Sequence, residues 1–184
     1  VVVTDWEKAD LRGPCNVLIR TPWNYAEKIE KFIKKILEVE KSGGKILHPS
    51  NIVLWNAHKE YLCDSEHTVK TELIRLNQDS PLDFPVVIKP YYGAGGRNTY
   101  CVNSQEEYLK LSPHFGEEFL VQPYMESIKS IGEFSFIFFE HEFSHAVLKK
   151  TTGEEFRIQD NYGGIVEKYS PNQDEIREVQ KILN

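Results

Sequence analysis

Residues 84–97, Phe-Pro-Val-Val-Ile-Lys-Pro-Tyr-Tyr-Gly-Ala-Gly-Gly-Arg, constrain this chain more than any other stretch. The β-branched run at 86–88 predicts a short buried strand. That strand ends at Lys89, and residues 93–96 are Gly-Ala-Gly-Gly. A lysine at the end of a buried strand is costly unless an anion meets it there. Glycines let backbone N–H groups approach that anion and let the loop move. The segment therefore predicts a binding site for the phosphates of a nucleotide triphosphate.

The spacing of this loop excludes two common phosphate-binding motifs. Residues 93–96 are not followed by Lys-Ser/Thr, so the loop is not a P-loop, and the GxGxxG of a dinucleotide fold is missing. The same segment also fits a plain turn after a core strand, with Lys89 in solvent. The segment alone does not decide between these two interpretations.

Composition limits the classes of partner. A chain of 184 residues is long enough for a buried core, in one domain or two small lobes. Its formal charge of −6 argues against a general nucleic-acid-binding surface. The three cysteines (Cys15, Cys63 and Cys101) lack CxxC spacing, which predicts reduced thiols and a cytoplasmic location. We expect neither a signal peptide nor a membrane partner, because no apolar run reaches the length of a membrane span.

Hydrophobic periodicity predicts alternating strands and helices, hence an α/β or α+β fold with the Lys89 strand near its middle. Apolar residues at i, i+3, i+4, i+7 and i+8 predict a helix over 29–37, and residues 132–150 alternate as a hairpin that turns at 140–142. Residues 64–83 show no clear period. The other predicted elements are strands at 1–3, 17–19, 99–102 and 119–122, and helices at 54–63, after Ser104 and after Pro171-Asn172.

His141-Glu-Phe-Ser-His145 matches the HExxH signature of zinc proteases. That motif binds zinc only on a helix, where residues i and i+4 share a face. Here it lies among strand-forming residues, with no evident third ligand. The pattern favours a coincidental match in a hairpin over a zinc hydrolase.

Several segments resemble the ATP-grasp superfamily, in the branch of prokaryotic glutathione synthetase and D-cycloserine synthetase. The likeness runs from about Val17 to Gly164 with one weak stretch, and includes the strand, lysine and glycine loop described above. Residues 55–62, Trp-Asn-Ala-His-Lys-Glu-Tyr-Leu, are similar to a family helix whose lysine reaches the ATP phosphates. The resemblance thus implies that Lys59 and Lys89 are the two nucleotide lysines, and that Gly95 and Gly96 cover the phosphates.

Two further segments extend the resemblance. Residues 119–125, Phe-Leu-Val-Gln-Pro-Tyr-Met, resemble the hinge that offers backbone groups to adenine. This implies that Gln122, Tyr124 and Met125 bind ATP, and Glu133 stands where the family has an acidic residue near the ribose or substrate. Taken singly, each of these features is better explained as an ordinary strand end with core aromatics.

Residues 149–164 are similar to the stretch of glutathione synthetases that holds an arginine, an amide two residues later and a Gly-Gly pair. The resemblance implies that Arg157 faces the γ-phosphate and the acyl-phosphate intermediate, as a guanidinium that holds two oxygens at once can do. Gln159 takes the place of the usual asparagine and is expected to contact substrate. Residues 18–25 resemble a loop that faces the acceptor, which makes Arg20 a candidate carboxylate clamp.

The resemblance implies an ATP-grasp fold with two lobes and ATP between them. Residues 1–50 would be part of an N-terminal α/β substrate domain, 51–122 the small lobe, and 123–184 the large lobe without its C-terminal part. The family's Gly-apolar-Pro segment is missing between the two lysines. Its metal ligands lie on a later strand, which we expect beyond Asn184, so the metal ligands are unknown and the sequence looks trimmed or incomplete.

The implied function is an ATP-dependent carboxylate–amine ligase that forms an amide through an acyl phosphate, with ATP and Mg²⁺ as cofactors. Its partners would be a small carboxylate and a small amine, and homo-oligomerisation is left open. Two alternatives remain: an ATP-grasp kinase, and a non-catalytic ATP-binding module.

Overall fold

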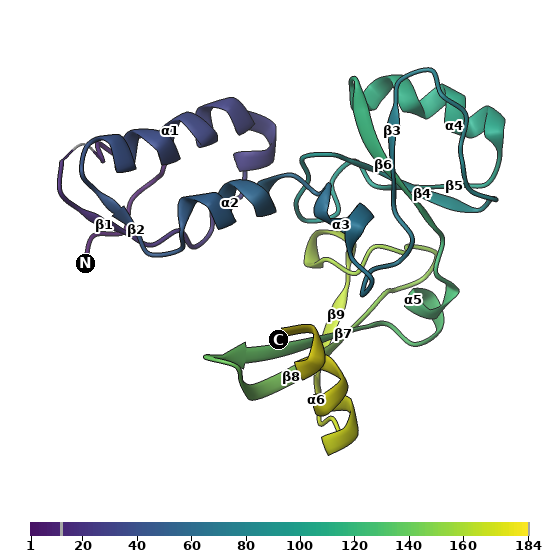
Figure 1. Cartoon of the computed structure of the whole chain (residues 1–184). Helices are drawn as coiled ribbons and strands as arrows, with labels where there is room; N and C mark the ends of the chain where they lie inside the picture. The colour runs from purple at the N-terminus through teal and green to yellow at the C-terminus, as the bar shows by residue number, and fades with distance from the viewer. Residues whose placement is uncertain (12, 184) are drawn as a thin grey trace. The chain divides into compact units, whose positions relative to one another are not determined.

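The computed structural model describes residues 1–11 and 13–183, which form two compact units, Val1–Pro123 and Tyr124–Asn184 (Figure 1). Each unit is described by itself. The first 57 residues of unit 1 hold β1 (Asn16–Val17), the 3-10 helix η1 (Tyr25–Lys28), α1 (Ile29–Lys41), β2 (Lys45–Ile46) and α2 (Ser50–Ala57). Strands β1 and β2 pair in parallel.

Helix α1 forms because its apolar side chains fall on one stripe. Phe32, Ile36 and Val39 are buried on that stripe and pack with Ile46 of β2. The helix ends just before Gly43, whose φ of 84° suits glycine. This confirms the helix predicted over 29–37 and extends it by one turn.

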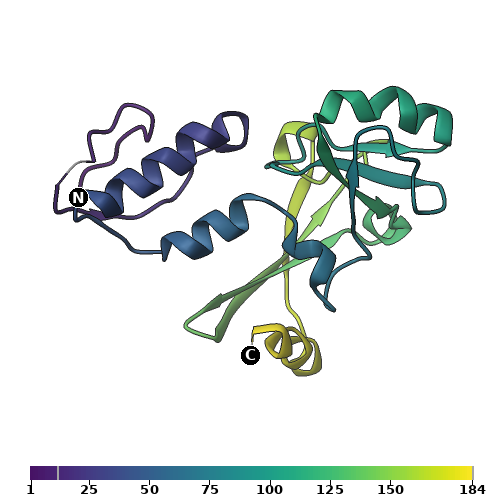
Figure 2. The ribbon, with the colours of Figure 1, turned by 45° about the horizontal axis from the view of Figure 1, so that its top comes forward.

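A four-stranded antiparallel sheet follows in unit 1, in the order β3-β6-β4-β5. Its strands are β3 (Glu72–Arg75), β4 (Val86–Pro90), β5 (Tyr100–Val102) and β6 (Glu118–Pro123). Between β5 and β6 the chain forms helix α4 (Gln105–Leu111) and the 3-10 helix η2 (Ser112–Phe115). Helix α4 lies along one face of the sheet (Figure 2). The core between them includes Val86, Ile88, Tyr108 and Phe119, which are fully buried. The predicted lysine strand is therefore an inner strand of this sheet.

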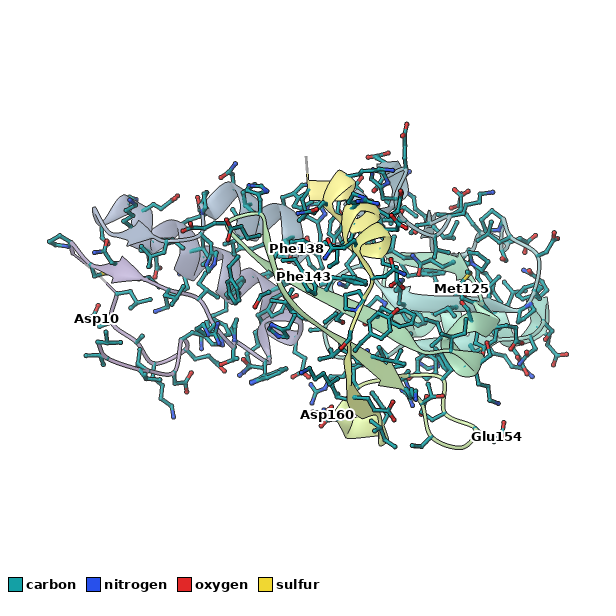
Figure 3. All side chains as sticks on the ribbon, turned by 90° about the horizontal axis from the view of Figure 1, so that it is seen from below. Asp10, Met125, Phe138, Phe143, Glu154 and Asp160 are labelled. Carbon is teal, nitrogen blue, oxygen red and sulfur yellow. The ribbon has the colours of Figure 1, made fainter. Side chains whose placement is uncertain are left out.

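Unit 2 is built on a three-stranded antiparallel sheet, β7 (Glu133–Phe139), β8 (Glu142–Lys150) and β9 (Ile165–Tyr169). Short helix α5 (Glu126–Ser130) precedes the sheet, 3-10 helix η3 (Asp160–Tyr162) precedes β9, and α6 (Gln173–Gln180) and 3-10 helix η4 (Lys181–Leu183) follow it. Phe138 and Phe143 face each other near the hairpin turn, with ring centroids 5.7 Å apart (Figure 3). Helix α6 begins with a full capping box between Asn172 and Glu175. The predicted hairpin and final helix are confirmed.

Three sequence predictions differ from the structure. Val1–Val3 form no strand and lie exposed, because strand propensity alone cannot hold a segment that pairs with nothing. The helix predicted over 54–63 is two helices, α2 and α3 (Tyr61–Asp64), separated where His58 is extended (φ −94°, ψ 158°). Strands β2, β3 and β9 were not predicted, since each carries too few apolar residues in alternation.

The HExxH residues lie on the β7–β8 hairpin. His141 is in the turn with φ 68°, and His145 is on β8 opposite Ile137. The two imidazoles therefore do not share a helix face, and the motif lies on the hairpin that the sequence predicted. In the described part of the chain, no helix has the length and apolarity needed to cross a bilayer. The three cysteines are not disulfide-bonded.

Candidate functional site

Lys89 stands at the end of β4 in the middle of the unit 1 sheet. It lies opposite Leu120 of β6 and directly follows the fully buried Ile88. Burial, with a smaller contribution from the nearby Lys59 ammonium, lowers the pKa of Lys89 from 10.5 to about 8. Two half-buried ammonium groups close to each other would be stabilised by an anion between them.

Lys59 reaches the same place from the connection between α2 and α3. Its backbone N–H donates to the carbonyl oxygen of Tyr91, two residues after Lys89, at 3.1 Å. Burial also lowers the pKa of the Lys59 amine. The structure therefore brings together the two lysines that the resemblance singled out, although they lie 30 residues apart in sequence.

The glycine loop follows these lysines. Gly95 and Gly96 have φ values of 63° and 72°, where a side chain is strained, and Asn98 also has a positive φ of 51°. A Cβ at Gly95 would meet no atom within 4 Å, so the need for glycine there is conformational rather than steric. The space beside Gly95 would let an anion approach the backbone of the loop closely.

We expect the loop from Gly93 to Arg97 to be mobile without nucleotide and ordered with it, because loops that close over phosphates have low local stability. Amide hydrogen exchange with and without a non-hydrolysable ATP analogue measures this. The exchange of residues 93–97 should slow when the analogue binds, whereas the β7–β8 turn at 140–141 serves as an internal control that should not change. Equal protection of 93–97 in both states would identify a purely structural turn.

The predicted adenine segment crosses the boundary between the two units. Gln122 lies on β6 in unit 1, and its side-chain amide donates to the hydroxyl of buried Thr71 at 2.7 Å. Its backbone is opposite Val87 of β4. Tyr124 and Met125 lie in unit 2, where the Tyr124 ring meets Phe156 edge-on. Met125, whose position is labelled in Figure 3, lies just before α5. Its exposed fraction is 41%. A role for Gln122 in adenine binding would thus use its backbone rather than its side chain.

Arg157 is held in unit 2 by Glu155. The guanidinium donates to both carboxylate oxygens of Glu155, from Nε at 2.9 Å and from Nη2 at 2.7 Å. Its Cζ lies 3.5 Å from the centre of the Tyr162 ring. The guanidinium lowers the pKa of the Glu155 carboxyl to about 2. Both side chains are about three-quarters buried, so this fork-shaped pair fixes the plane of Arg157 rather than leaving it loose in solvent.

The other predicted residues of unit 2 lie around the same loop and the sheet. Glu133 on β7 pairs with Lys149 on β8 at 3.3 Å. The side-chain carbonyl oxygen of Gln159 is buried without a hydrogen-bond partner among the described residues. Gly164 passes so close to the carbonyl of Ile158 that a Cβ would clash with it, and Gly163 has a φ of 79° that favours glycine.

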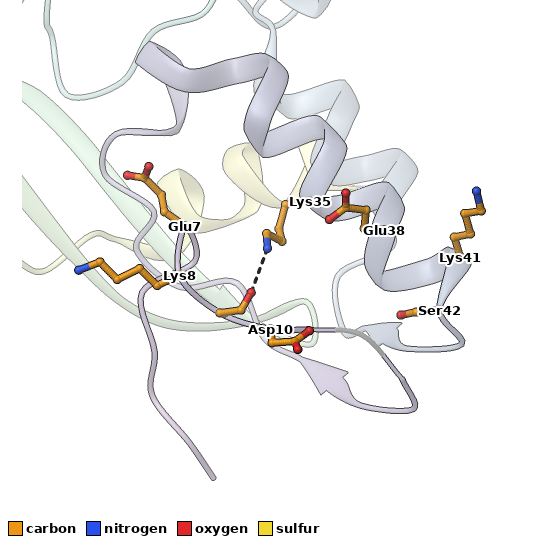
Figure 4. Close-up of a pocket in the computed structure, with 8 residues that line it drawn as sticks. Glu7, Lys8, Asp10, Lys35, Glu38, Lys41 and Ser42 are labelled. Atoms are coloured by element: carbon orange, nitrogen blue, oxygen red, sulfur yellow. Dashed lines mark hydrogen bonds between the residues drawn. The ribbon is translucent and has the colours of Figure 1, made fainter.

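Arg20 is exposed in the loop between β1 and η1 of unit 1. Its neighbour Ile19 lines an apolar pocket with Tyr25, Phe32, Ile52 and Val53. A second hollow, between the N-terminal segment and α1, has a charged lining that includes Glu7, Asp10, Lys35 and Lys41 (Figure 4). Lys35 there donates to the carbonyl of Ala9 at 2.9 Å, and none of the predicted site residues lines this hollow.

Mg²⁺ needs a set of oxygen ligands. Within residues 1–11 and 13–183, no three His, Cys, Asp or Glu side chains lie together in a way that could hold a metal ion. The described side chains therefore form no three-ligand site for Mg²⁺.

The chain aligns in structure with solved structures of known proteins. No family model matches the chain. The crystal structure of D-cycloserine synthetase DcsG aligns with a TM-score of 0.72 and 20% identity, covering 96% of this chain and 65% of that one. D-alanine–D-alanine ligase from Helicobacter pylori aligns with a TM-score of 0.54 and 13% identity, covering 82% and 49%. The chain has the ATP-grasp fold, which confirms the resemblance and the mixed α/β class.

One relative in sequence is the cycloserine biosynthesis protein DcsG of Streptomyces lavendulae. It is 25% identical over 170 residues, which cover 80% of this chain and 56% of that protein. The chain thus spans little more than half of the length of this curated relative.

Sequence reasoning missed two partners of the predicted site residues. Glu155 has a recognisable signal, because residues i and i+2 of an extended segment share a face and Glu155 and Arg157 are so spaced. The contact between Lys59 and Tyr91 has no such signal, since it depends on how α3 meets the end of β4.

Proposed function

We propose that this chain is the nucleotide-binding part of an ATP-dependent carboxylate–amine ligase. The observation that carries the proposal is the pair of half-buried lysines, Lys59 and Lys89, beside a glycine loop in an ATP-grasp fold. Residues 1–50 would belong to a substrate domain, 51–122 to the small lobe and 123–184 to the large lobe. The relatives named above support a ligase that acts on small molecules.

Each residue has a positioning or electrostatic task in this proposal. Lys59 and Lys89 bind the phosphates, Gly95 and Gly96 cover them, and the backbone around Gln122 together with Tyr124 and Met125 receives adenine. Glu133 lies near the ribose or the substrate. Three further residues act on the reacting groups: Arg20 clamps a carboxylate, Gln159 contacts substrate, and Arg157 faces the transferred phosphoryl group.

The reaction proceeds in two transfers. A carboxylate oxygen of the acid attacks the γ-phosphorus of ATP, and ADP leaves with the electron pair of the broken P–O bond. The amine then attacks the acyl-phosphate carbon, loses a proton, and inorganic phosphate leaves. Negative charge accumulates on the phosphoryl oxygens in the first transfer, so a fixed guanidinium stabilises that transition state more than the ground state. Mg²⁺ would accompany ATP and offset phosphate charge.

The pKa of Lys89 leads to a pH prediction. Below about pH 8 Lys89 is protonated and ready for the phosphates. Above it, free protein holds a neutral amine and must take up a proton when ATP binds, so affinity falls as pH rises through 8. Between pH 7 and 9.5 we expect ATP affinity to weaken about 30-fold, because a group with a pKa of about 8 falls from mostly protonated to about 3% protonated over this range. Isothermal titration calorimetry in buffers of different ionisation enthalpy measures both the affinity and the proton uptake.

Lys89→Arg is the matched control for this experiment, because a guanidinium stays charged throughout the range. This variant should show a flat profile around pH 8 and no proton uptake there. A wild-type affinity that does not change between pH 7 and 9.5 would remove Lys89 from the phosphate site.

The ligase is separated from its alternatives by its products. Full-length protein should release ADP only when an acid and an amine are both present, and mass spectrometry should detect their amide. A phosphorylated product without any amine requirement would identify a kinase, and ATP binding without turnover for any pair would identify a binding module.

A further inference from the structure

Tyr91, at the start of the glycine loop, contacts three consecutive residues: His58, Lys59 and Glu60. The His58 ring stacks on the Tyr91 ring with centroids 5.3 Å apart and planes at 5°. The Lys59 N–H donates to the Tyr91 carbonyl at 3.1 Å, and the Tyr91 hydroxyl donates to Glu60 Oε2 at 2.7 Å. Ring, backbone and hydroxyl of one tyrosine therefore each hold one of three successive residues.

These contacts join two segments that otherwise have reason to separate. Lys59 and Lys89 carry like charges close enough for Lys59 to lower the pKa of Lys89. His58 to Glu60 form the break between α2 and α3, where His58 is extended and no helix or strand fixes the chain. Some interaction must offset the repulsion and hold this connection against β4, and the structure places it at Tyr91.

Tyr92 extends the cluster. Its ring meets Tyr91 edge-on at 4.9 Å and His58 edge-on at 6.5 Å. Burial and the Glu60 carboxylate together raise the pKa of the Tyr91 hydroxyl, so it stays protonated and able to donate at neutral pH. At neutral pH the Tyr91 hydroxyl therefore donates its hydrogen bond to Glu60 whether or not ATP is bound.

We infer that Tyr91 is a positioning residue that clamps the Lys59 segment onto the Lys89 strand and so assembles the two-lysine phosphate site before nucleotide arrives. This inference rests on the proposed function of the two lysines as the ATP phosphate site. Pre-assembly matters because a lysine side chain that must be ordered on binding loses affinity to conformational entropy.

The test compares Tyr91→Leu, Tyr91→Phe and the control Tyr100→Phe, which removes a hydroxyl from the partly exposed neighbouring strand β5. Calorimetry with ATP and with adenosine is the first measurement, since adenosine lacks phosphates. We expect Tyr91→Leu to bind ATP about tenfold more weakly, equivalent to ~1.4 kcal/mol, with adenosine affinity within about twofold of wild type. Tyr91→Phe keeps the stacked ring and loses one hydrogen bond, so its ATP affinity should fall about threefold. Tyr100→Phe should match wild type.

The second measurement does not depend on nucleotide. Protein labelled with ¹³C at lysine Cε reports each amine's titration by NMR, and Lys89→Arg identifies the Lys89 signal. In Tyr91→Leu the pKa of Lys89 should rise from about 8 toward 10.5, because Lys59 moves away and water reaches the amine.

The outcomes separate the inference from the function on which it rests. If Lys89→Ala weakens ATP binding but folded Tyr91→Leu and Tyr91→Phe bind ATP normally, the clamp is wrong and the phosphate site stands. If Lys89→Ala leaves ATP affinity unchanged, the proposed function fails, and the Lys89 titration alone judges the clamp. An unchanged Lys89 pKa in Tyr91→Leu would overturn it. Should Tyr91→Leu not fold, Tyr91→Phe decides by the same two measurements.

Discussion

Replacing Arg157 by alanine should lower the turnover of full-length protein about 10³-fold, or roughly 4 kcal/mol of transition-state stabilisation. ATP affinity should change far less, because a guanidinium facing the transferred group acts mainly as charge builds up on it. Coupled measurement of ADP release gives turnover, and calorimetry gives affinity. The result expected from the proposed role is a large fall in kcat with a small change in Kd.

Three variants make this result interpretable. Arg157→Lys keeps the charge but loses the two-pronged contact with Glu155, so it should recover only part of the activity. Glu155→Gln keeps an acceptor for the Arg157 N–H groups and removes the carboxylate charge, which tests whether the pair orients the arginine. Arg177→Ala, on exposed helix α6, should match wild type. Normal turnover in folded Arg157→Ala would show that Arg157 serves only the packing around Tyr162.

Replacing Lys89 by methionine should weaken ATP binding and stabilise the fold at the same time. The loss of a charge-assisted contact is expected to cost ~1.5–3 kcal/mol of ATP binding. Removing a cation whose pKa burial lowers from 10.5 to about 8 should raise the free energy of unfolding by ~1–3 kcal/mol at pH 7. Urea denaturation and calorimetry measure the two effects.

The pH dependence fixes the sign of the stability effect. At pH 7 Lys89 is charged in both the folded and the unfolded chain, so folding bears the full cost of burying the cation. That cost is relieved as pH rises from about 8 to 10.5, because the folded protein then holds the neutral amine. The stability gap between Lys89→Met and wild type should therefore shrink over this range. Lys168→Met, an exposed lysine on β9, should change stability by less than about 0.5 kcal/mol at any pH. A Lys89→Met variant less stable than wild type at pH 7 would contradict the cost assigned to the buried charge.

The fold was predictable where local pattern and tertiary packing agree. The apolar stripe of α1, the β-branched run of β4 and the alternation of β7 and β8 each satisfy one periodicity and one buried face. The strand predicted at Val1–Val3 was wrong, because a β-branched run without a pairing partner has only its propensity to support it. Strand β3 has two central apolar residues, Leu73 and Ile74, and is a strand because β6 offers it a hydrogen-bonding edge. No local signal in residues 64–83 carries that information.

The candidate site also has some features that local sequence predicts and others that depend on tertiary packing. Lys89 and the glycine loop could be found from the sequence, since a lysine after a core strand and a glycine-rich loop are local features. That Lys59 joins Lys89 depended on the resemblance, and the structure supports it through the Tyr91 carbonyl. The i, i+2 spacing of Glu155 and Arg157 was a usable local signal for that pair. The contacts of Tyr91 with residues 58–60 had no such signal, because they depend on how packing brings α3 to the end of β4.

Transfer of oxygen from the acid to phosphate tests the central claim most directly. Full-length protein would be incubated with ATP and one amino acid labelled with ¹⁸O in its carboxylate. Each labelled acid would be tested alone and together with each candidate amine. The inorganic phosphate released would then be examined by mass spectrometry. An acyl-phosphate ligase predicts one ¹⁸O atom in phosphate for each amide formed, because the carboxylate oxygen that attacks the γ-phosphorus leaves with it. Amide formed with unlabelled phosphate, or ADP formed with no amide for any pair, would contradict the proposed mechanism.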